Sequence, residues 1–438
     1  MKKPSRLKHL VPVALALAVL AVIAARAGGP LVVGGPGMAE GVPFVWTTIN
    51  PLTYWTDLGS LGVMNNSDAN NLVQQAFQAW QDVPTATISF SRTAALGTDV
   101  TASNIMSVRD ALYDCSTLPG EPAGGIAKPR TIVYDTDGTI LEALGEDPDS
   151  ILGFATALCF TTDGTNNNFN RGFALINGTF MTGPSDTTLV KAVMMHEFGH
   201  LIGLDHSQIN LNCLTSHCLP GSDDLEGVPT MFPVLIDEPA MSTLATDDIA
   251  AISALYPEST FPTSTGRITG HVLFSDGQTP AQGFNVIARK TDNALVTAVS
   301  SVSGFRYTVD VGNPVYPWGG SPYGSRDPAL IGSYDLPGLP DGSYTVEVEA
   351  IHNSEPIPFV DGSSVGPIGN YGFQFPLPSL LPTPPPCTPQ YLVSSATATC
   401  NSADATTLTV SAGSVVSAGT DVILIGTPPR YDAWEDVP

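Results

Sequence analysis

Apolar residues recur at helical spacing in three segments of the chain. The segment 67–80 has one apolar face, and Ser67 is its candidate N-cap. The segment 187–204 is apolar over most of its length. A third segment begins near Thr246, a further candidate N-cap, and ends at Pro257. These patterns predict three helices.

Short apolar or alternating runs predict strands in the same half of the chain. They lie at 42–58, 87–90, 104–108, 131–134 and 172–176. The run 172–176 precedes the second helix directly, and we expect it to be an edge strand that binds an extended peptide by backbone pairing. Helices and strands mixed in this way predict an α+β domain.

No helical periodicity is evident after the Ser/Thr/Pro-rich segment 258–266, which predicts a linker. Alternating runs between Gly, Pro and Asp turns predict an all-β sandwich over 267–427. Within it, the Pro-rich stretch 356–390 predicts an irregular insertion, and 428–438 is an acidic tail. The expected strands are 267–274, 284–289, 294–302, 307–311, 343–351, 405–410 and 420–425.

Residues 1–27 have the composition of a signal peptide. Basic residues precede an uncharged apolar run, and Ala25-Arg26-Ala27 matches a cleavage site. An uncleaved membrane anchor is the alternative, but the run is short for a full span. We therefore expect cleavage, secretion, no stable membrane anchor and a flexible Gly-rich lead-in at 28–41.

Charge and cysteine content narrow the function further. The 438 residues include 17 Lys and Arg against 41 Asp and Glu, a formal net charge of −24 that repels nucleic acid. Six cysteines in an exported chain predict disulfides. Sequence order favours three pairs, although other pairings remain open. These pairs are Cys115–Cys159, Cys213–Cys218 and Cys387–Cys400.

His196, His200 and His206 have the spacing of a zinc site. Residues four apart lie on one face of a helix, so two imidazoles can reach one ion. Gly203 permits the sharp turn that brings His206 round as a third ligand. Three histidines leave one position open, as in catalytic zinc sites. Glu197 is the expected general base, which accepts a proton from water and passes it to the leaving amine.

A core helix with incidental histidines is the alternative to a zinc site. A bare HExxH pattern can arise by chance in a helix. Here three His, one Glu and one Gly fall within eleven residues of a chain that has seven His in total. Gly203 is also costly inside a helix unless the helix ends there. The segment therefore predicts one catalytic Zn2+.

The segment 196–206 resembles the metzincin peptidases, whose signature HExxHxxGxxH is followed by a Met-turn. Residues 229–233 (Pro-Thr-Met-Phe-Pro) are the candidate turn, and the resemblance places Met231 beneath the ligands as an apolar floor. Further stretches resemble the matrixin branch, namely 52–54, 76–80 and 244–256. The resemblance implies a metzincin domain over 42–257, with a twisted mixed sheet and three main helices. It also implies an endopeptidase acting on extracellular proteins or peptides.

Two matrixin features are missing from the sequence. The first cysteine is Cys115, so no cysteine switch is visible, and no histidine between His9 and His196 is present to hold a second zinc. The span from His206 to Met231 is longer than in typical matrixins. The resemblance therefore does not predict which substrate side chain is preferred next to the cleaved peptide bond.

The sequence has two further features of interest, a candidate Ca2+ site and a second family resemblance. Asp135 and Asp137 alternate before a glycine and form a candidate Ca2+ site, with a solvated acidic turn as the alternative. The stretch 266–351 resembles the carboxypeptidase regulatory-like or transthyretin-like sandwich, through 270–272 and 339–346 among others. That resemblance implies a stabilising or binding module.

The leading hypothesis is a secreted zinc endopeptidase. The alternative is an extracellular binding or adhesion protein with a non-catalytic metzincin domain. The intact ligand set and Glu197 favour the peptidase.

Overall fold

The computed structural model describes residues 29–34, 38–39, 41–211, 213, 225, 227–281, 283–304, 308–309, 320–321, 332–351, 353–354, 357–358, 387 and 389–425. The expected signal peptide, most of the Pro-rich insertion, the acidic tail and Cys218 lie outside these residues. The described part is an α+β structure with several sheets. No helix in it is long and apolar enough to cross a membrane.

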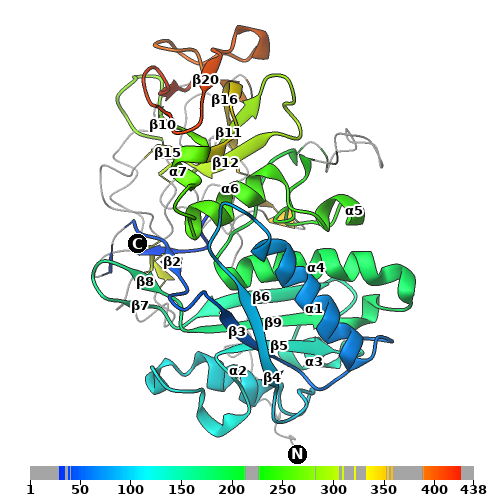
Figure 1. Cartoon of the computed structure of the whole chain (residues 1–438). Helices are drawn as coiled ribbons and strands as arrows, with labels where there is room; N and C mark the ends of the chain where they lie inside the picture. Colours follow the sequence, from blue (N-terminus) through cyan, green and yellow to red (C-terminus); the bar gives the residue numbers. More distant parts are fainter. Residues whose placement is uncertain are drawn as a thin grey trace, which may run out of the picture.

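A five-stranded sheet is the centre of the first half of the chain (Figure 1). Its order is β4-β3-β5-β9-β6, and all neighbours are parallel except β6 and β9. The strands are β3 Leu52–Thr56, β4 Phe90–Ala95, β5 Arg130–Asp135, β6 Gly153–Leu158 and β9 Arg171–Asn177. Beside it, a small sheet joins β2 Phe44–Val45, β7 Thr161–Thr162 and β8 Asn167–Asn168.

Helices cover both faces of this sheet (Figure 1). They are α1 Asn66–Gln81 and α4 Thr187–Ile202 on one face, and α2 Ile105–Tyr113 and α3 Thr139–Leu144 on the other. Ile132 and Tyr134 share a core with α1 and α4, whereas Val133 packs with α2 and α3. This split follows from the alternation of side chains along a strand. Phe77 of α1 stacks on Phe198 of α4, with ring centroids 4.0 Å apart.

Residues 266–425 contribute two sheets that enclose a second core. One has the order β15-β10-β21, with β22 also on β10, and the other β12-β11-β16-β19, with β20 also on β16. The strands are β10 Gly266–Leu273, β11 Phe284–Lys290, β12 Ala298–Val302, β15 Ser333–Leu339, β16 Gly342–Ala350, β19 Gln390–Tyr391, β20 Leu408–Val410, β21 Val415–Val416 and β22 Val422–Ile423. Two small sheets join β1 Val33–Gly34, β13 Thr308–Val309 and β14 Gly320–Ser321, and β17 Asn353–Ser354 with β18 Ile357–Pro358.

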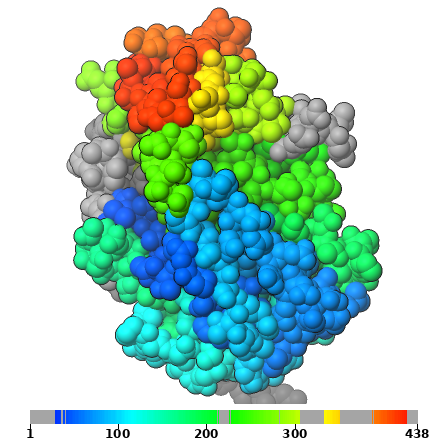
Figure 2. All heavy atoms as spheres, in the orientation of Figure 1, coloured from blue at the N-terminus to red at the C-terminus, as the bar shows by residue number. Residues whose placement is uncertain are grey.

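Helix α6, Thr246–Leu255, connects the two cores. Ile252 belongs to the first core and Ala250 to the second. Gly338 of β15 has a φ of +75°, and a Cβ there would lie 2.8 Å from that of Ala250, so a side chain would not fit. In Figure 2 the second half of the chain, coloured from yellow-green to red, lies directly on the first. Two short helices flank α6, α5 Glu238–Met241 and α7 Phe261–Ser264.

The three expected helices are confirmed, with shifted ends. Asn65 rather than Ser67 caps α1, and its side chain accepts a hydrogen bond from the Asp68 N–H. The disulfides Cys115–Cys159 and Cys387–Cys400 are also confirmed. The third expected pair includes Cys218, which is outside the described residues.

Three expectations were wrong. The segment 104–108 is not a strand but the start of α2, whose buried residues Ile105, Val108 and Leu112 repeat at helical spacing. The run 172–176 is not an edge strand, because β9 lies between β5 and β6 and is buried along its whole length. The lead-in 28–41 is not simply flexible, since it includes β1 and buried Leu31.

Candidate metal centre

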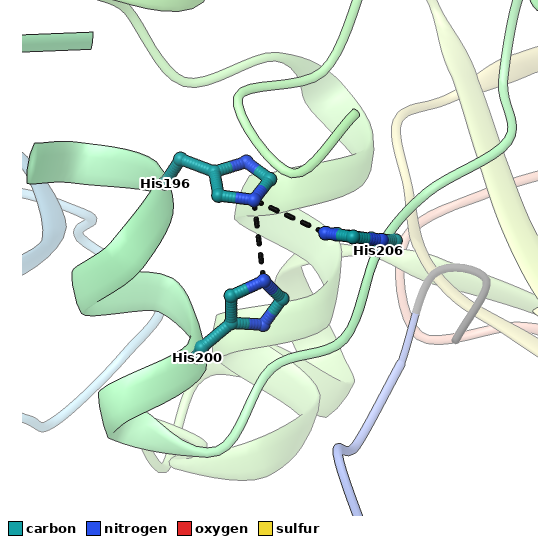
Figure 3. Close-up of side chains that lie close together, drawn as sticks. All are labelled: His196, His200 and His206. Carbon is teal, nitrogen blue, oxygen red and sulfur yellow. Dashed lines mark hydrogen bonds between the residues drawn. The ribbon is translucent and has the colours of Figure 1, made fainter. Parts of the chain in front are cut away.

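Helix α4 and the segment after it bring three histidines to one point. Nε2 of His196 lies 3.2 Å from Nε2 of His200 and 3.1 Å from Nε2 of His206. Figure 3 shows the three rings converging, two from the helix and one from the chain beyond it. Among the described residues, these histidines are the only group of three or more potential ligands close enough to hold one ion.

Gly203 ends α4 and turns the chain back toward the histidines. It has the left-handed φ of +101° that favours glycine, as the sequence predicts. Its N–H donates to the carbonyl of His200 over 3.0 Å. A Cβ at this position would lie 2.8 Å from the ring of Phe169. The turn therefore needs glycine for its backbone angle and for the space available.

Backbone carbonyls orient two of the three rings. Nδ1 of His196 lies 2.8 Å from the carbonyl oxygen of Thr230, and Nδ1 of His200 lies 3.0 Å from that of Leu204. A proton on each Nδ1 leaves Nε2 free as a ligand atom. Nδ1 of His206 has no hydrogen-bond partner among the described residues. The third ring therefore depends on the backbone that carries it.

Burial keeps these histidines neutral. It lowers the pKa of His196 to about 4 and of His200 to about 3, and it holds the pKa of His206 well below the usual range. Neutral imidazole is the form that binds a metal ion. Three such nitrogens, with their Nε2 atoms facing one another, fit Zn2+.

Glu197 lies between the histidine helix and β6. Its side chain is 6% exposed and accepts a hydrogen bond from the backbone of Ala155. Burial raises the pKa of its carboxyl to about 8, and the bond from Ala155 opposes that rise. A Cβ on Gly153 would lie 3.1 Å from Cγ of Glu197, so the carboxylate side chain packs closely on this strand.

Met231 is buried beneath α4, and its sulfur lies against Gly199. Its carbonyl accepts the N–H of Ser207 over 2.8 Å. The preceding residue, Thr230, carries the carbonyl that orients His196. This turn therefore contacts the chain on both sides of the histidine cluster, at His196 and just after His206.

Asp248 holds the turn at Thr230 and Met231, a contact that the sequence did not predict. Its carboxylate accepts the N–H groups of Thr230 and Met231 over 2.8 and 3.0 Å. Burial, with the nearby charge of Asp247, raises its pKa to about 7. In the sequence, Asp247 and Asp248 stand together in the first turn of a predicted helix, but such a pair by itself indicates only a favourable interaction with the helix dipole.

The candidate calcium residues already have protein partners. The carboxylate of Asp135 is fully buried and accepts the N–H groups of Ile140 and Leu141, at the start of α3. Oδ1 of Asp137 accepts the hydroxyl of Thr139 over 2.6 Å. The two carboxylates therefore organise the turn before α3, and calcium binding here stays a prediction.

Comparison with known proteins assigns no family to the chain. No family model matches its sequence, and no match was found among curated proteins. The geometry of the histidine cluster and its surroundings is therefore the main indication of function.

Proposed function

We propose that the chain is a secreted zinc-dependent endopeptidase of the metzincin type, with a matrixin-like domain. His196, His200 and His206 would hold the zinc ion, and Met231 would form the floor of the site. The single observation that carries this proposal is the meeting of three neutral Nε2 atoms at the helix that also carries the buried carboxyl of Glu197. The second core, by resemblance, would belong to a transthyretin-like module.

Glu197 is the general base and acid of the proposed reaction. When bound, zinc would lower the pKa of water to ~7, polarise the scissile carbonyl and favour the ionised form of the nearby glutamate. Glu197 accepts a proton from the attacking water and then donates it to the leaving amine. The hydrogen bond from Ala155 holds the carboxylate in place for both transfers.

The outer strand β6 supports a peptide as the substrate. It pairs only with β9 among the described strands, and the N–H of Asn177 donates to the carbonyl of Leu152 just before it. Backbone groups alternate in direction in an antiparallel pair, so those of Gly153 and Ala155, which are both partly exposed, point away from β9. The N–H of Ala155 already donates to Glu197. An extended peptide can pair with this edge. We therefore propose β6, rather than the segment 172–176, as the strand that binds the substrate.

The alternative is an extracellular binding or adhesion protein with a non-catalytic metzincin domain. That alternative gives no role to the buried carboxyl of Glu197, although burying a carboxyl is costly enough to raise its pKa. The net charge of −24 supports protein rather than nucleic-acid partners under either function.

The deciding experiment compares purified wild-type protein with Glu197→Gln on casein and on a peptide library. Removing the general base while leaving all three imidazoles should lower cleavage ~100-fold or more, with one zinc per chain retained. Glu142→Gln, which changes an exposed glutamate on α3, is the matched control and should cleave like wild type. Equal cleavage by Glu197→Gln and wild type would contradict the proposed function.

A further inference from the structure

Side chains from the second half of the molecule hold the segment directly after His206. Ser207, Gln208 and Asn210 are each no more than 1% exposed. Nε2 of Gln208 donates to Oε1 of Glu349 over 2.7 Å. Oδ1 of Asn210 accepts Nη1 of Arg289 over 2.8 Å. Both partners belong to the β12-β11-β16-β19 sheet.

These partners lie on the face of that sheet opposite its core. Strand β11 pairs Asn285 with Glu349 of β16, and Ile287 with Ser300 of β12. Alternate residues such as Val286 and Val348 enter the core of the second half, so this face points away from it. We call it the polar face. Its polar members are Asn285, Arg289, Ser300, Glu347 and Glu349.

Hydrogen bonds within the polar face hold its side chains in place. Oε1 of Glu349 also accepts Nδ2 of Asn285 over 2.9 Å. Nε of Arg289 lies 2.6 Å from Oε1 of Glu347, in an ion pair that is largely shielded from solvent. Charged groups in such surroundings are costly unless each is paired. The arrangement therefore favours one position for the segment after His206.

Apolar and backbone contacts also hold the segment after His206 against the second half of the molecule. Ile209 is 1% exposed and packs with Ile287 and Ala298 of the sheet. Asn210 adopts a φ of +61°, and its Nδ2 donates to the carbonyls of Leu295 and Gly227 over 3.0 and 3.1 Å. Residues 207–210 are thus fixed at every position by the second half or by α6.

Asp247 of α6 joins the polar face to the same segment. Its carboxylate accepts the N–H of Ser300 over 2.7 Å and a hydrogen bond from the side chain of Ser207. Asp248, the next residue, holds Met231, whose carbonyl in turn binds the N–H of Ser207. Ser207 is therefore anchored from two directions.

His206 differs from the other two histidines because no carbonyl orients its ring. His196 and His200 each contact a carbonyl through Nδ1, whereas Nδ1 of His206 has no hydrogen-bond partner in the described part of the chain. The backbone on both sides therefore holds the ring: Oδ1 of Asp205 accepts the N–H of His206 over 2.8 Å, and residues 207–210 are anchored as described.

We propose that the polar face is a positioning element of the metal centre, which sets the third ligand by holding residues 207–210. The proposal rests on the proposed function only in that the site binds a metal ion. The β-sandwich half is thereby part of the active unit, in addition to any separate binding role.

The test uses three variants of the full chain and measures zinc affinity by chelator competition. Glu349→Ala removes the acceptor of Gln208 and should weaken zinc binding by up to ~10-fold, the lower end of the effect of losing a direct partner of a ligand, because Glu349 acts through Gln208. Glu349→Gln keeps an acceptor oxygen and should restore binding. Tyr334→Phe is the control, because its hydroxyl donates to Thr420 within the sandwich, away from the polar face.

The absorption spectrum of the cobalt-substituted protein gives a second measurement. It reports ligand geometry and should change in Glu349→Ala but not in Tyr334→Phe. If Glu349→Ala and Tyr334→Phe lose stability alike, with unchanged zinc affinity and spectrum, the polar face is only structural and the proposal fails. A wild-type chain that binds zinc but cleaves nothing refutes the peptidase and leaves this result intact. A wild-type chain that binds no zinc refutes both.

Discussion

Gly199 shows how closely the metal centre is packed at the scale of single residues. It occupies the middle of the histidine motif, and the sulfur of Met231 fills the space that a side chain would need. The resemblance to the metzincins implied that Met231 lies beneath the histidines, because the motif and the Met-turn are both local patterns. It did not predict the need for glycine at position 199, which depends on a contact between segments distant in the sequence.

Gly199→Ala separates packing from helix propensity. Propensity alone predicts a gain of about 1 kcal/mol in the free energy of unfolding, because alanine favours helix. Overpacking against Met231 should instead cost about 1–3 kcal/mol and weaken zinc binding. Gly97→Ala, at a glycine with no atom within 4 Å of a Cβ, is the control for urea denaturation. A more stable Gly199→Ala would refute the packing argument.

At the scale of elements, local patterns predicted the helices better than the strands. The three long helices carry apolar faces over several turns, and each is present. The segment 104–108 was too short for its helical period to be seen, so its apolar residues resembled a strand. The position of β9 inside the sheet was equally hidden, because the order of strands depends on distant pairing.

The end of α4 offers a test at this scale. Gly203→Ala should cost about 2–3 kcal/mol, from the left-handed backbone and from contact with Phe169. It should also weaken zinc binding, because the turn sets the Leu204 carbonyl that orients His200.

Gly164→Ala is the matched control for that substitution. Gly164 has a φ of +89°, but no atom lies within 4 Å of a Cβ there. The change should therefore carry only the backbone cost of about 1–2 kcal/mol, with zinc affinity unchanged. Equal effects of the two substitutions on thermal unfolding and on zinc affinity would show that the turn does not contribute to the metal centre.

At the scale of the whole molecule, the sequence predicted two halves but not how they meet. Alternation along β11 and β16 indicated strands with one polar side, which ordinarily faces water. In the structure that side is the polar face, covered by the chain after His206. Neither Asn210 nor Arg289 carried a local signal of this contact, because their bond spans 79 residues.

The buried carboxyl of Glu349 makes stability depend on pH. Burial, with the charge of Glu347, raises its pKa to about 7, above its unfolded value of about 4.3. The folded state therefore binds the proton more tightly, so this contribution is full below about pH 4 and is lost as pH rises through 7.

Wild type should consequently lose stability relative to Glu349→Gln between pH 5 and pH 8, by at most about 3 kcal/mol. Thermal unfolding of both proteins across this range measures the difference, and effects of the shared histidines cancel. A difference that stays constant with pH would show that Glu349 does not titrate in this range.

Because Gln208 and Glu349 are 141 residues apart, they are also synthesised at different times. A ribosome adding ~5–20 residues per second needs roughly seven to thirty seconds to pass from one to the other. During that interval the nascent chain already carries every histidine of the motif, but not the strand that fixes the last of them. The three histidines are therefore synthesised first, and the proposed contacts that position His206 can form only after β16 has emerged.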